Sequence, residues 1–312
     1  MNPPPDQLPS APGQSVDEFL VGVEVGPAII RAGIFDSHYR LHGKTNITTR
    51  VERGTAAIIE RIVKCIHYAV DECDLSLAQI SRIGIAVSGR ISQNGVVESC
   101  PELLWQDVPL RAALAAQLDA QVEVGQVHEL GALGIRSLEF DTPVPRFATI
   151  FLAPQIGAAV SINDEWQDLS ALHENPGETD ALSRNILATI PNSQFAHYRG
   201  RDFRKALRKP EKVDVWNYVT QIAETAGLCA ARIQRHYSPE VIALGGGLID
   251  EMKEEILAVV QASFERAAKG AIGTLPPLLP SRLGDLAPIT GAAIWANGRG
   301  EPSTAFMAGA VQ

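Results

Sequence analysis

Two segments of this chain repeat one local pattern, and that repetition constrains the fold more than any other feature. Residues 19–26 form an apolar run that ends in a Gly-Pro turn, and a second apolar run returns over residues 29–35. Residues 147–152 and 156–162 repeat this arrangement around another proline. Short apolar runs separated by Gly and Pro are typical of buried strands joined by tight turns. The sequence therefore predicts two β-hairpins, each opening one of two similar domains.

Helical periodicity alternates with short apolar runs in both halves, which predicts a mixed α/β fold. After the first hairpin we expect a helix at 53–70, a strand at 83–87, a helix near 110–118, a strand at 121–124 and a helix from about 129 to 137. In the second half we expect a helix at 213–236, a strand at 241–244, a turn at 245–247, a helix from 250 to about 269 and a last helix from 290. The predicted organisation is a disordered Pro-rich tail at 1–17, an α/β domain at 18–138 and a second at 139–312, with the last helix, about 289–300, packing back on the first domain.

Composition excludes several classes of protein. With 46% hydrophobic residues, 20% charged residues and a mean hydropathy of +0.03, the chain of 312 residues has enough apolar material for a packed core. No run approaches the roughly 20 apolar residues of a membrane span. A net charge of −9 disfavours binding to nucleic-acid phosphates or to anionic membranes. Four scattered cysteines suggest neither a disulfide framework nor a cysteine zinc site. We therefore expect a cytoplasmic globular protein.

Four segments, in this order along the chain, resemble the ROK family (repressor, open reading frame, kinase) of sugar kinases and sugar-responsive regulators. Residues 23–28 stand where the family has its D-I-G-G-T hairpin, and residues 84–110 resemble its G-I-G-x-P-G…G-x-V…W…P-L stretch. Residues 238–247 are similar to N-P-E-x-I-V-L-G-G-G, and residues 283–293 to L-G-x-x-A-G-x-x-G-A-A. The resemblance implies two actin-like (ribonuclease H-like) α/β domains, each with a five-stranded sheet, that bind sugar and nucleotide in a central cleft.

The groups that would hold nucleotide phosphates are altered. Phosphoryl transfer needs backbone amides and a hydroxyl around the phosphates. In the first hairpin Gly26 is followed by Pro27, which has no N–H, and by Ala28, which has no hydroxyl. The family's second phosphate loop, G-T-G-x-G, keeps Gly157 here and carries Pro154 where a donor is expected. The resemblance places the adenosine against three retained glycines, which a tight strand-to-helix turn would also explain: Gly245, Gly246 and Gly247.

The family's catalytic carboxylate is also missing. Its N-D-A-N-A-A segment corresponds to residues that begin with Gln126 and Val127, and valine cannot accept a proton. Losing a general base costs about 10²–10⁴ in rate. Glu129 and His128, which follow directly, and Glu24, at the acidic position of the hairpin, are the candidate replacement bases. The helix macrodipole alone would favour a carboxylate such as Glu129 in a first turn.

The remaining site residues follow from the resemblance. It assigns the sugar to Gly89 as closely approaching backbone, to Gln126 and to Glu178, although Glu178 also fits an exposed loop. The family's C-x-C-G-x-x-G-C zinc segment is replaced by residues 182–212, which lack cysteine, so no zinc is expected. Residues 199–212 form a basic cluster, which indicates either a site for phosphate or an acidic partner, or a solvated helix face.

Three hypotheses follow. The first is a non-phosphorylating ROK homologue, cytosolic and homodimeric, that binds a sugar or sugar-like metabolite and acts by conformation or through a partner. The second is an active hexose or amino-sugar kinase that uses Mg-ATP and a relocated base. The third is a lyase, isomerase or hydrolase whose Glu24, His128, Glu129 and Glu178 converge on the cleft. Regulators of the family carry an N-terminal winged helix-turn-helix, which the ~17 residues before the first strand cannot form, so direct DNA binding is not expected.

Overall fold

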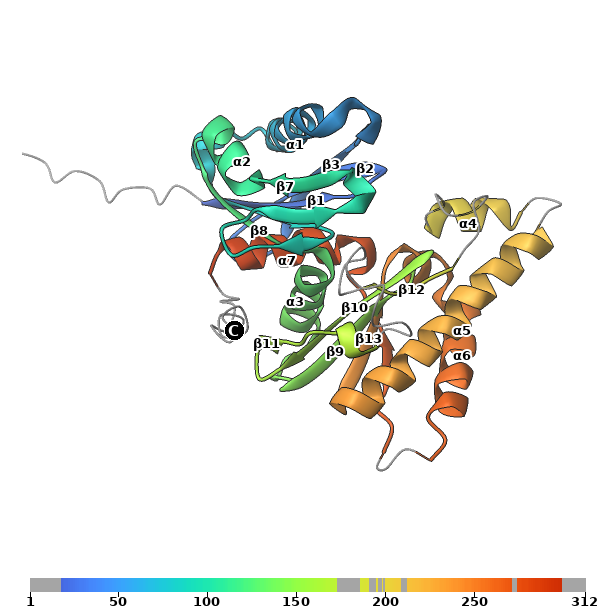
Figure 1. Cartoon of the computed structure of the whole chain (residues 1–312). Helices are drawn as coiled ribbons and strands as arrows, with labels where there is room; N and C mark the ends of the chain where they lie inside the picture. Colours follow the sequence, from blue (N-terminus) through green and yellow to red (C-terminus); the bar gives the residue numbers. More distant parts are fainter. Residues whose placement is uncertain are drawn as a thin grey trace, which may run out of the picture.

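The elements that the sequence predicts occur in the predicted order along the chain, with further short elements between them (Figure 1). The structure, a computed structural model, describes residues 18–172, 186–190, 195, 198, 200–208, 212–270 and 274–298. The first-half elements are β1 (Phe19–Val25), β2 (Ile29–Phe35), β3 (Leu41–Thr48), α1 (Gly54–Asp71), β4 (Ile80–Val87), β5 (Arg90–Ile91), β6 (Val97–Cys100), β7 (Trp105–Val108), α2 (Leu110–Leu118), β8 (Gln121–Gln126) and α3 (Val127–Glu139). The second-half elements are β9 (Arg146–Phe151), β10 (Gln155–Ile162), β11 (Glu165–Trp166), β12 (Ile186–Thr189), α4 (Gly200–Ala206), α5 (Lys212–Tyr237), β13 (Val241–Gly245), α6 (Gly247–Ala267), β14 (Leu278–Pro280) and α7 (Ala287–Ala296).

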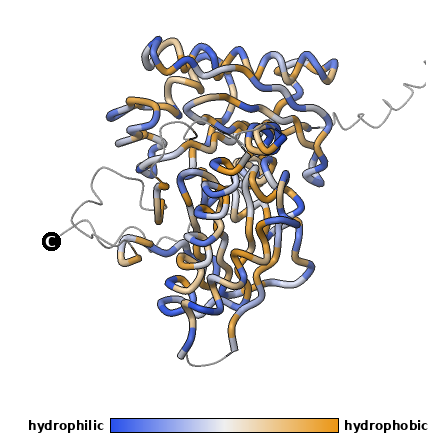
Figure 2. The backbone as a smooth tube through the Cα atoms, turned by 90° about the vertical axis from the view of Figure 1, so that its right-hand side faces the viewer, coloured by the Kyte–Doolittle hydropathy of each residue, from blue (hydrophilic) through white to orange (hydrophobic). Residues whose placement is uncertain are grey.

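The first sheet has five strands in the order β3-β2-β1-β4-β8. Strands β1, β2 and β3 are antiparallel neighbours, whereas β1–β4 and β4–β8 are parallel pairs that require helical crossovers. Helix α1 covers one face with apolar residues spaced three or four apart, among them Ile58, Ile62 and Ile66, which pack in one core with Val21 and Val23 of β1. Figure 2 shows hydrophobic segments running through the interior of the molecule and hydrophilic segments on its outside.

The second sheet has six strands, which corrects the expectation of five. Its main path is β11-β10-β9-β13-β14, and β12 pairs with the free end of β10. Strands β11 and β12, which both pair with the same edge of β10, are two and four residues long, too short to give a periodic signal in the sequence. Helices α5 and α6 bury one face of this sheet in a single core with Ala148 and Ile150 of β9.

Two helices, α3 and α7, lie between the sheets (Figure 1). Helix α7 touches the first sheet with its backbone: Gly22 and Gly84 are register partners on β1 and β4, and a Cβ at either would overlap a carbonyl of α7. Helix α3 packs on the second sheet with Ile135 against Phe147 and Phe151. The two helices cross closely because a Cβ on Gly291 of α7 would overlap a carbonyl of α3. The middle layer therefore depends on glycine as much as on apolar burial.

Several described elements have no counterpart in the sequence prediction. Strand β3 alternates partly buried and exposed residues, and its composition is largely polar. Strands β5, β6 and β7 form a separate three-stranded sheet from pieces of two to four residues. Their pairing depends on contacts that local periodicity does not record. Among the described residues, none of the helices combines the length and the hydropathy that crossing a membrane would require.

Candidate functional site

The turn between β1 and β2 offers few donors to a phosphate. The Gly26 N–H donates to the Ile29 carbonyl (2.9 Å), and Pro27 has no N–H. Thr49, which is fully buried, donates its hydroxyl to the Gly26 carbonyl (2.6 Å) and its N–H to the Ala28 carbonyl (3.0 Å). These hydrogen bonds stabilise the turn, and the Gly26 N–H is already bonded within it. The amide expected at position 27 and the hydroxyl expected at position 28 are both missing.

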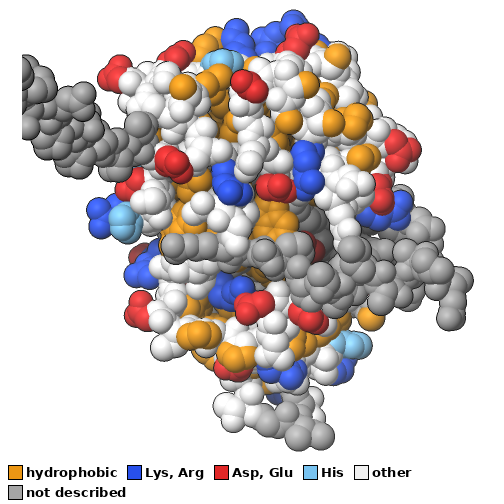
Figure 3. All heavy atoms as spheres, turned by 90° about the vertical axis from the view of Figure 1, so that its left-hand side faces the viewer, with side chains coloured by type: hydrophobic (Ala, Val, Ile, Leu, Met, Phe, Trp, Pro, Cys, Tyr) orange, Lys and Arg blue, Asp and Glu red, His pale blue; other side chains and the backbone are white. Residues whose placement is uncertain are grey.

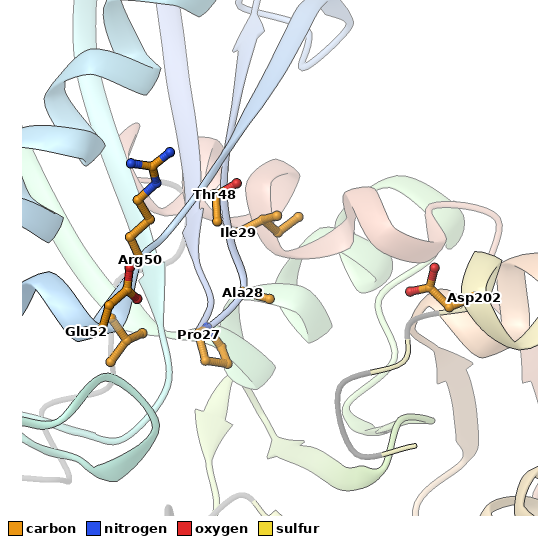
Figure 4. Close-up of a pocket in the computed structure, with 8 residues that line it drawn as sticks. Pro27, Ala28, Ile29, Thr48, Arg50, Glu52 and Asp202 are labelled. Carbon is orange, nitrogen blue, oxygen red and sulfur yellow. The ribbon is translucent and has the colours of Figure 1, made fainter. Parts of the chain in front are cut away.

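A hollow of about 630 Å³ lies between this turn and α4 (Figure 4). Its lining residues are Pro27, Ala28, Ile29, Thr48, Arg50, Val51, Glu52 and Asp202. Asp202 stands on α4, across the hollow from Pro27 and Ala28. The lining thus presents one cation, Arg50, and two carboxylates, Glu52 and Asp202. The two negative charges would repel a polyanion such as a triphosphate. A triphosphate would meet no net positive charge among these residues.

Glu24 belongs to a network that ties the first hairpin to α6 and the start of α7. Glu24 and Arg31 face each other on β1 and β2, with Arg31 Nη1 3.1 Å from Glu24 Oε2. Arg31 also donates to the backbone carbonyl of Asp285 and lies 3.4 Å from its carboxylate. The Asp285 N–H donates to Asp250 Oδ2 (2.7 Å), while burial raises the pKa of Asp250. Through Arg31, the carboxylate of Glu24 therefore helps to connect the first hairpin to Asp285 and Asp250 in the second half of the chain.

Gln126 and His128 form a closed unit at the N-terminus of α3. Gln126 Oε1 accepts from the N–H groups of His128 (2.6 Å) and Glu129 (3.1 Å), which makes Gln126 the N-cap. This orientation leaves Gln126 Nε2 to donate to His128 Nδ1 (3.0 Å), so the neutral ring carries its proton on Nε2. Desolvation lowers the pKa of His128 to about 4. A histidine with this pKa is a weak base at neutral pH.

Position 127 and its neighbour Glu129 lie in the first turn of α3. Val127 packs on a small cluster that includes Leu130 of α3 and Ala292 of α7, so an apolar side chain fits where the family has its carboxylate. Glu129 is partly exposed, and its place in the first turn stabilises the helix through the macrodipole. Glu24 pairs with Arg31, whereas His128 hydrogen-bonds to Gln126.

The glycines expected at the site have packing reasons of their own. Gly89 has a φ of +101°, and a Cβ there would overlap the Ser99 carbonyl of β6. Gly157 lies directly under the His128 ring. Gly246 has a φ of +92° and is the N-cap of α6, between Gly245, which ends β13, and Gly247, which faces the Asp285 carboxylate. These contacts account for the glycines without a ligand, and their assignment to sugar or nucleotide stays a prediction.

Glu102 is a partly buried carboxylate between β6 and β7 that the sequence analysis missed. Burial raises its pKa, while the side chains of Ser88 and Gln155 act to lower that pKa. Ser88 follows β4 of the first sheet, whereas Gln155 opens β10 of the second sheet. The short sheet β5-β6-β7 brings Glu102 here, and no local motif in the sequence marks it.

Ion pairs with α6 account for part of the basic cluster. Arg204 of α4 lies 2.9 Å from Glu255, and Arg201 lies 3.7 Å from Glu251. On the side of the molecule away from α4, which Figure 3 shows, Lys, Arg, Asp and Glu side chains are interspersed. Glu178 lies outside the described residues, as do residues 1–17. Within the described part of the chain, no group of three or more His, Cys, Asp or Glu side chains is arranged to hold a metal ion.

Comparisons with known proteins fit this architecture. A glucokinase of the ROK family from Streptomyces griseus, solved with glucose and AMPPNP, superimposes with a TM-score of 0.72 at 18% identity, covering 90% of this chain and 99% of that one. A ROK transcriptional regulator, a homolog of the E. coli MLC protein, gives a TM-score of 0.64 at 13% identity, covering 90% and 78%. These likenesses show the fold, which is two actin-like α/β domains.

Sequence comparison gives the family. The protein named "Putative xylose repressor" of Caldicellulosiruptor sp. (strain Rt8B.4) is 24% identical over 147 residues, which are 47% of this chain and only 37% of that relative's length. The model of the ROK family matches residues 20–168 and 180–299, most of the chain. Sugar kinases and repressors of one family are thus the relatives of this protein, and the chain belongs to the ROK family.

Proposed function

We propose that this protein binds a sugar or sugar-like metabolite between its two domains and does not transfer phosphate. The single observation that carries the proposal is the β1–β2 turn, where the Gly26 N–H is bonded within the turn, Pro27 has no amide N–H and Ala28 has no hydroxyl. The loss of the carboxylate at Val127 supports it independently.

The magnitudes favour loss of turnover over slow turnover. A missing general base costs about 10²–10⁴ in rate. Each lost hydrogen bond to a charged group costs about 1.5–3 kcal/mol, and about 1.4 kcal/mol is a factor of ten. Without assuming that these losses add, about 10⁴ or more of the rate is missing. Neither His128, with its lowered pKa, nor Glu24, bound to Arg31, is placed to restore it.

Mg-ATP, which active sugar kinases of this fold use, does not fit the residues present. The hollow beside the turn carries two carboxylates against Arg50, and the turn lacks the donors named above. The relatives fit a sensing role, since they include a transcriptional regulator and a named repressor as well as kinases. We propose further that the ligand changes the conformation of the protein or its binding to a partner. We also propose that the protein is a homodimer and that its domains span residues 18–138 and 139–312.

Thermal stability with ligands tests the proposal. A ligand that binds only the native state adds about 2.7 kcal/mol at 100 times its Kd. We expect a higher melting temperature with at least one hexose, pentose or amino sugar and no change with Mg-ATP or Mg-ADP. A clear shift with nucleotide would instead favour an active kinase.

The variant Val127→Asp provides the second arm of the test. It restores the carboxylate but leaves the turn unchanged, so we expect no fast phosphorylation of any sugar in a coupled ADP-release assay. Strong activity in this single variant would contradict the proposal, because it would show that the turn still holds phosphate.

A further inference from the structure

One guanidinium connects carboxylates from both halves of the chain, and we call this group the Arg31 clasp: Glu24, Arg31, Asp250 and Asp285. The Arg31 side chain is only 14% exposed, and its Nη1 lies 3.1 Å from Glu24 Oε2 on the neighbouring strand. The guanidinium also donates to the Asp285 carbonyl and lies 3.4 Å from the Asp285 carboxylate. Arg31 therefore binds the first hairpin to the segment that precedes α7.

The alternation of side chains along the hairpin explains the position of the clasp. Glu24 comes two residues after Gly22 on β1, so both face the side of the sheet on which α7 packs. Arg31 is the register partner of Glu24, as Gly33 is of Gly22, and directly opposed residues share a face. The clasp thus continues the close contact between the first sheet and α7, two residues nearer the β1–β2 turn.

Two glycines make room for the carboxylates of the clasp. Gly284 has a φ of +49°, and a Cβ there would overlap the Asp250 carboxylate, which accepts the Asp285 N–H (2.7 Å). A Cβ on Gly247, the first residue of α6, would lie 2.7 Å from the Asp285 carboxylate. Asp285 therefore covers one of the three glycines that the resemblance assigns to adenosine, and it is joined to the first turn of α6 through Asp250.

The negative charges of the clasp outnumber its positive charge. The clasp has three carboxylates and one guanidinium. Burial raises the pKa of Asp250, and so do the charges of Asp285 and Glu251, whereas Arg31 lowers it. Without Arg31, carboxylates from the two halves of the chain would repel each other. Arg31 therefore supplies, as a fixed side chain, the positive charge that offsets this repulsion.

We propose that the Arg31 clasp is a built-in conformational link, which couples the first hairpin to the first turn of α6. The link needs no bound ion or nucleotide, because Arg31 itself provides the bridging charge. Guanidinium suits this role, since its planar fork of donors can serve Glu24 and Asp285 at the same time. The clasp does not depend on sugar binding, so it can be tested without any ligand.

Hydrogen exchange of backbone amides in the full chain, measured by mass spectrometry of short peptides, provides the test. The reporters are the Thr49 N–H, which donates at the first hairpin, and the Ile249 N–H, which donates in the first turn of α6. In Arg31→Gln we expect both amides to exchange about 10-fold faster or more, the worth of one hydrogen bond to a charged group. The Asp119 N–H at the end of α2 reports general destabilisation and should not change.

A substitution at the other end of the clasp provides the reciprocal arm. Asp285→Asn removes the charge that faces Arg31, so exchange should also rise at Thr49 in the first hairpin, because coupling acts in both directions. Arg31→Lys keeps the charge without the fork of donors and should lie between the wild type and Arg31→Gln. The matched control is Arg204→Gln, which breaks an exposed ion pair with Glu255 of α6 and should change neither reporter.

The pattern of exchange decides the outcome. Faster exchange at both Thr49 and Ile249 in Arg31→Gln, with Asp119 unchanged, supports the clasp. A rise at Thr49 alone would show a local bond within the hairpin and would overturn the proposal. Equal rises at all three amides would show general destabilisation and would overturn it as well. If Arg31→Gln does not fold, Arg31→Lys is judged by the same pattern, and neither result bears on sugar binding.

Discussion

The two hairpins start from the same local pattern and end in different surroundings. When the two hairpins are aligned on their turn prolines, Pro27 and Pro154, Gly22 of β1 corresponds to Thr149 of β9. Gly22 lies under the backbone of α7, whereas Thr149 is fully buried and donates to the Ala159 carbonyl (3.4 Å) within its own sheet. The first sheet therefore meets the middle layer through backbone, and the second sheet meets it through side chains such as Phe147 and Phe151.

The turns differ in the same way. The first turn opens on the hollow beside α4. The second turn is covered by β12, because the Ile190 N–H donates to the Pro154 carbonyl (2.9 Å) and Gln155 pairs with Thr189. Similar local sequence patterns thus specify similar hairpins, while the neighbouring elements decide which hairpin borders a hollow. Four experiments can break or sharpen this comparison.

The largest effect is expected at the backbone contact. Gly22→Ala places a Cβ where the Ile289 carbonyl lies, and we expect a loss of more than about 3 kcal/mol, since neither the strand nor the helix backbone can move without disturbing the other. Thr149→Ala removes one long hydrogen bond and should cost about 1 kcal/mol. Urea denaturation followed by circular dichroism compares the two. Equal losses would show that the difference between the hairpins has no energetic weight.

Acid should weaken the joint at the second hairpin, where His128 packs on Gly157. The pKa of His128 is lowered to about 4 from an ordinary 6.5, so the unfolded chain binds the proton more readily between these values. The contribution of neutral His128 to the free energy of unfolding is fully present above about pH 6.5 and is lost as the pH falls toward 4. Between pH 7 and 5 the loss is at most about 2 kcal/mol. His128→Gln should flatten that part of the stability profile, and an unchanged profile would place the acid sensitivity elsewhere.

Restoring donors should matter in the first turn alone. The double variant Pro27→Gly with Ala28→Thr supplies an amide and a hydroxyl beside the hollow, and we expect it to bind Mg-ADP at concentrations where the wild type shows no binding, because each hydrogen bond to a charged group is worth about a factor of 10 or more. Pro154→Gly should not change it, because β12 covers that turn. Calorimetric titration measures both. A gain in the Pro154 variant would reverse the assignment of the two turns.

The smallest effect is expected at α4, away from both hairpins. Arg204→Gln breaks an exposed ion pair with Glu255 and should cost less than about 1 kcal/mol. Arg31→Gln, which removes a partly buried guanidinium between Glu24 and Asp285, should cost more. Thermal melts at low and high salt distinguish them, since screening affects the exposed pair most. An equal cost for both variants would argue that Arg31 does not fasten the first hairpin.

The helices and buried strands could be predicted closely, because their apolar residues repeat at helical or strand spacing over many residues. The helix expected at 53–70 is α1, Gly54–Asp71, and the helix expected at 213–236 is α5, Lys212–Tyr237. The edge strands β11 and β12 were not predictable, because pieces of two and four residues exist only through their pairing with β10.

The site shows the same division. Pro27, Ala28 and Val127 could be identified from the sequence, because the absence of an N–H, a hydroxyl or a carboxylate is a property of the residue itself. Tertiary structure decided that Gln126 caps α3, that His128 is desolvated, and that Glu102 reaches Ser88 and Gln155. These properties depend on which groups meet in space, and residues far apart in the chain meet only when strand register and helix packing bring them together.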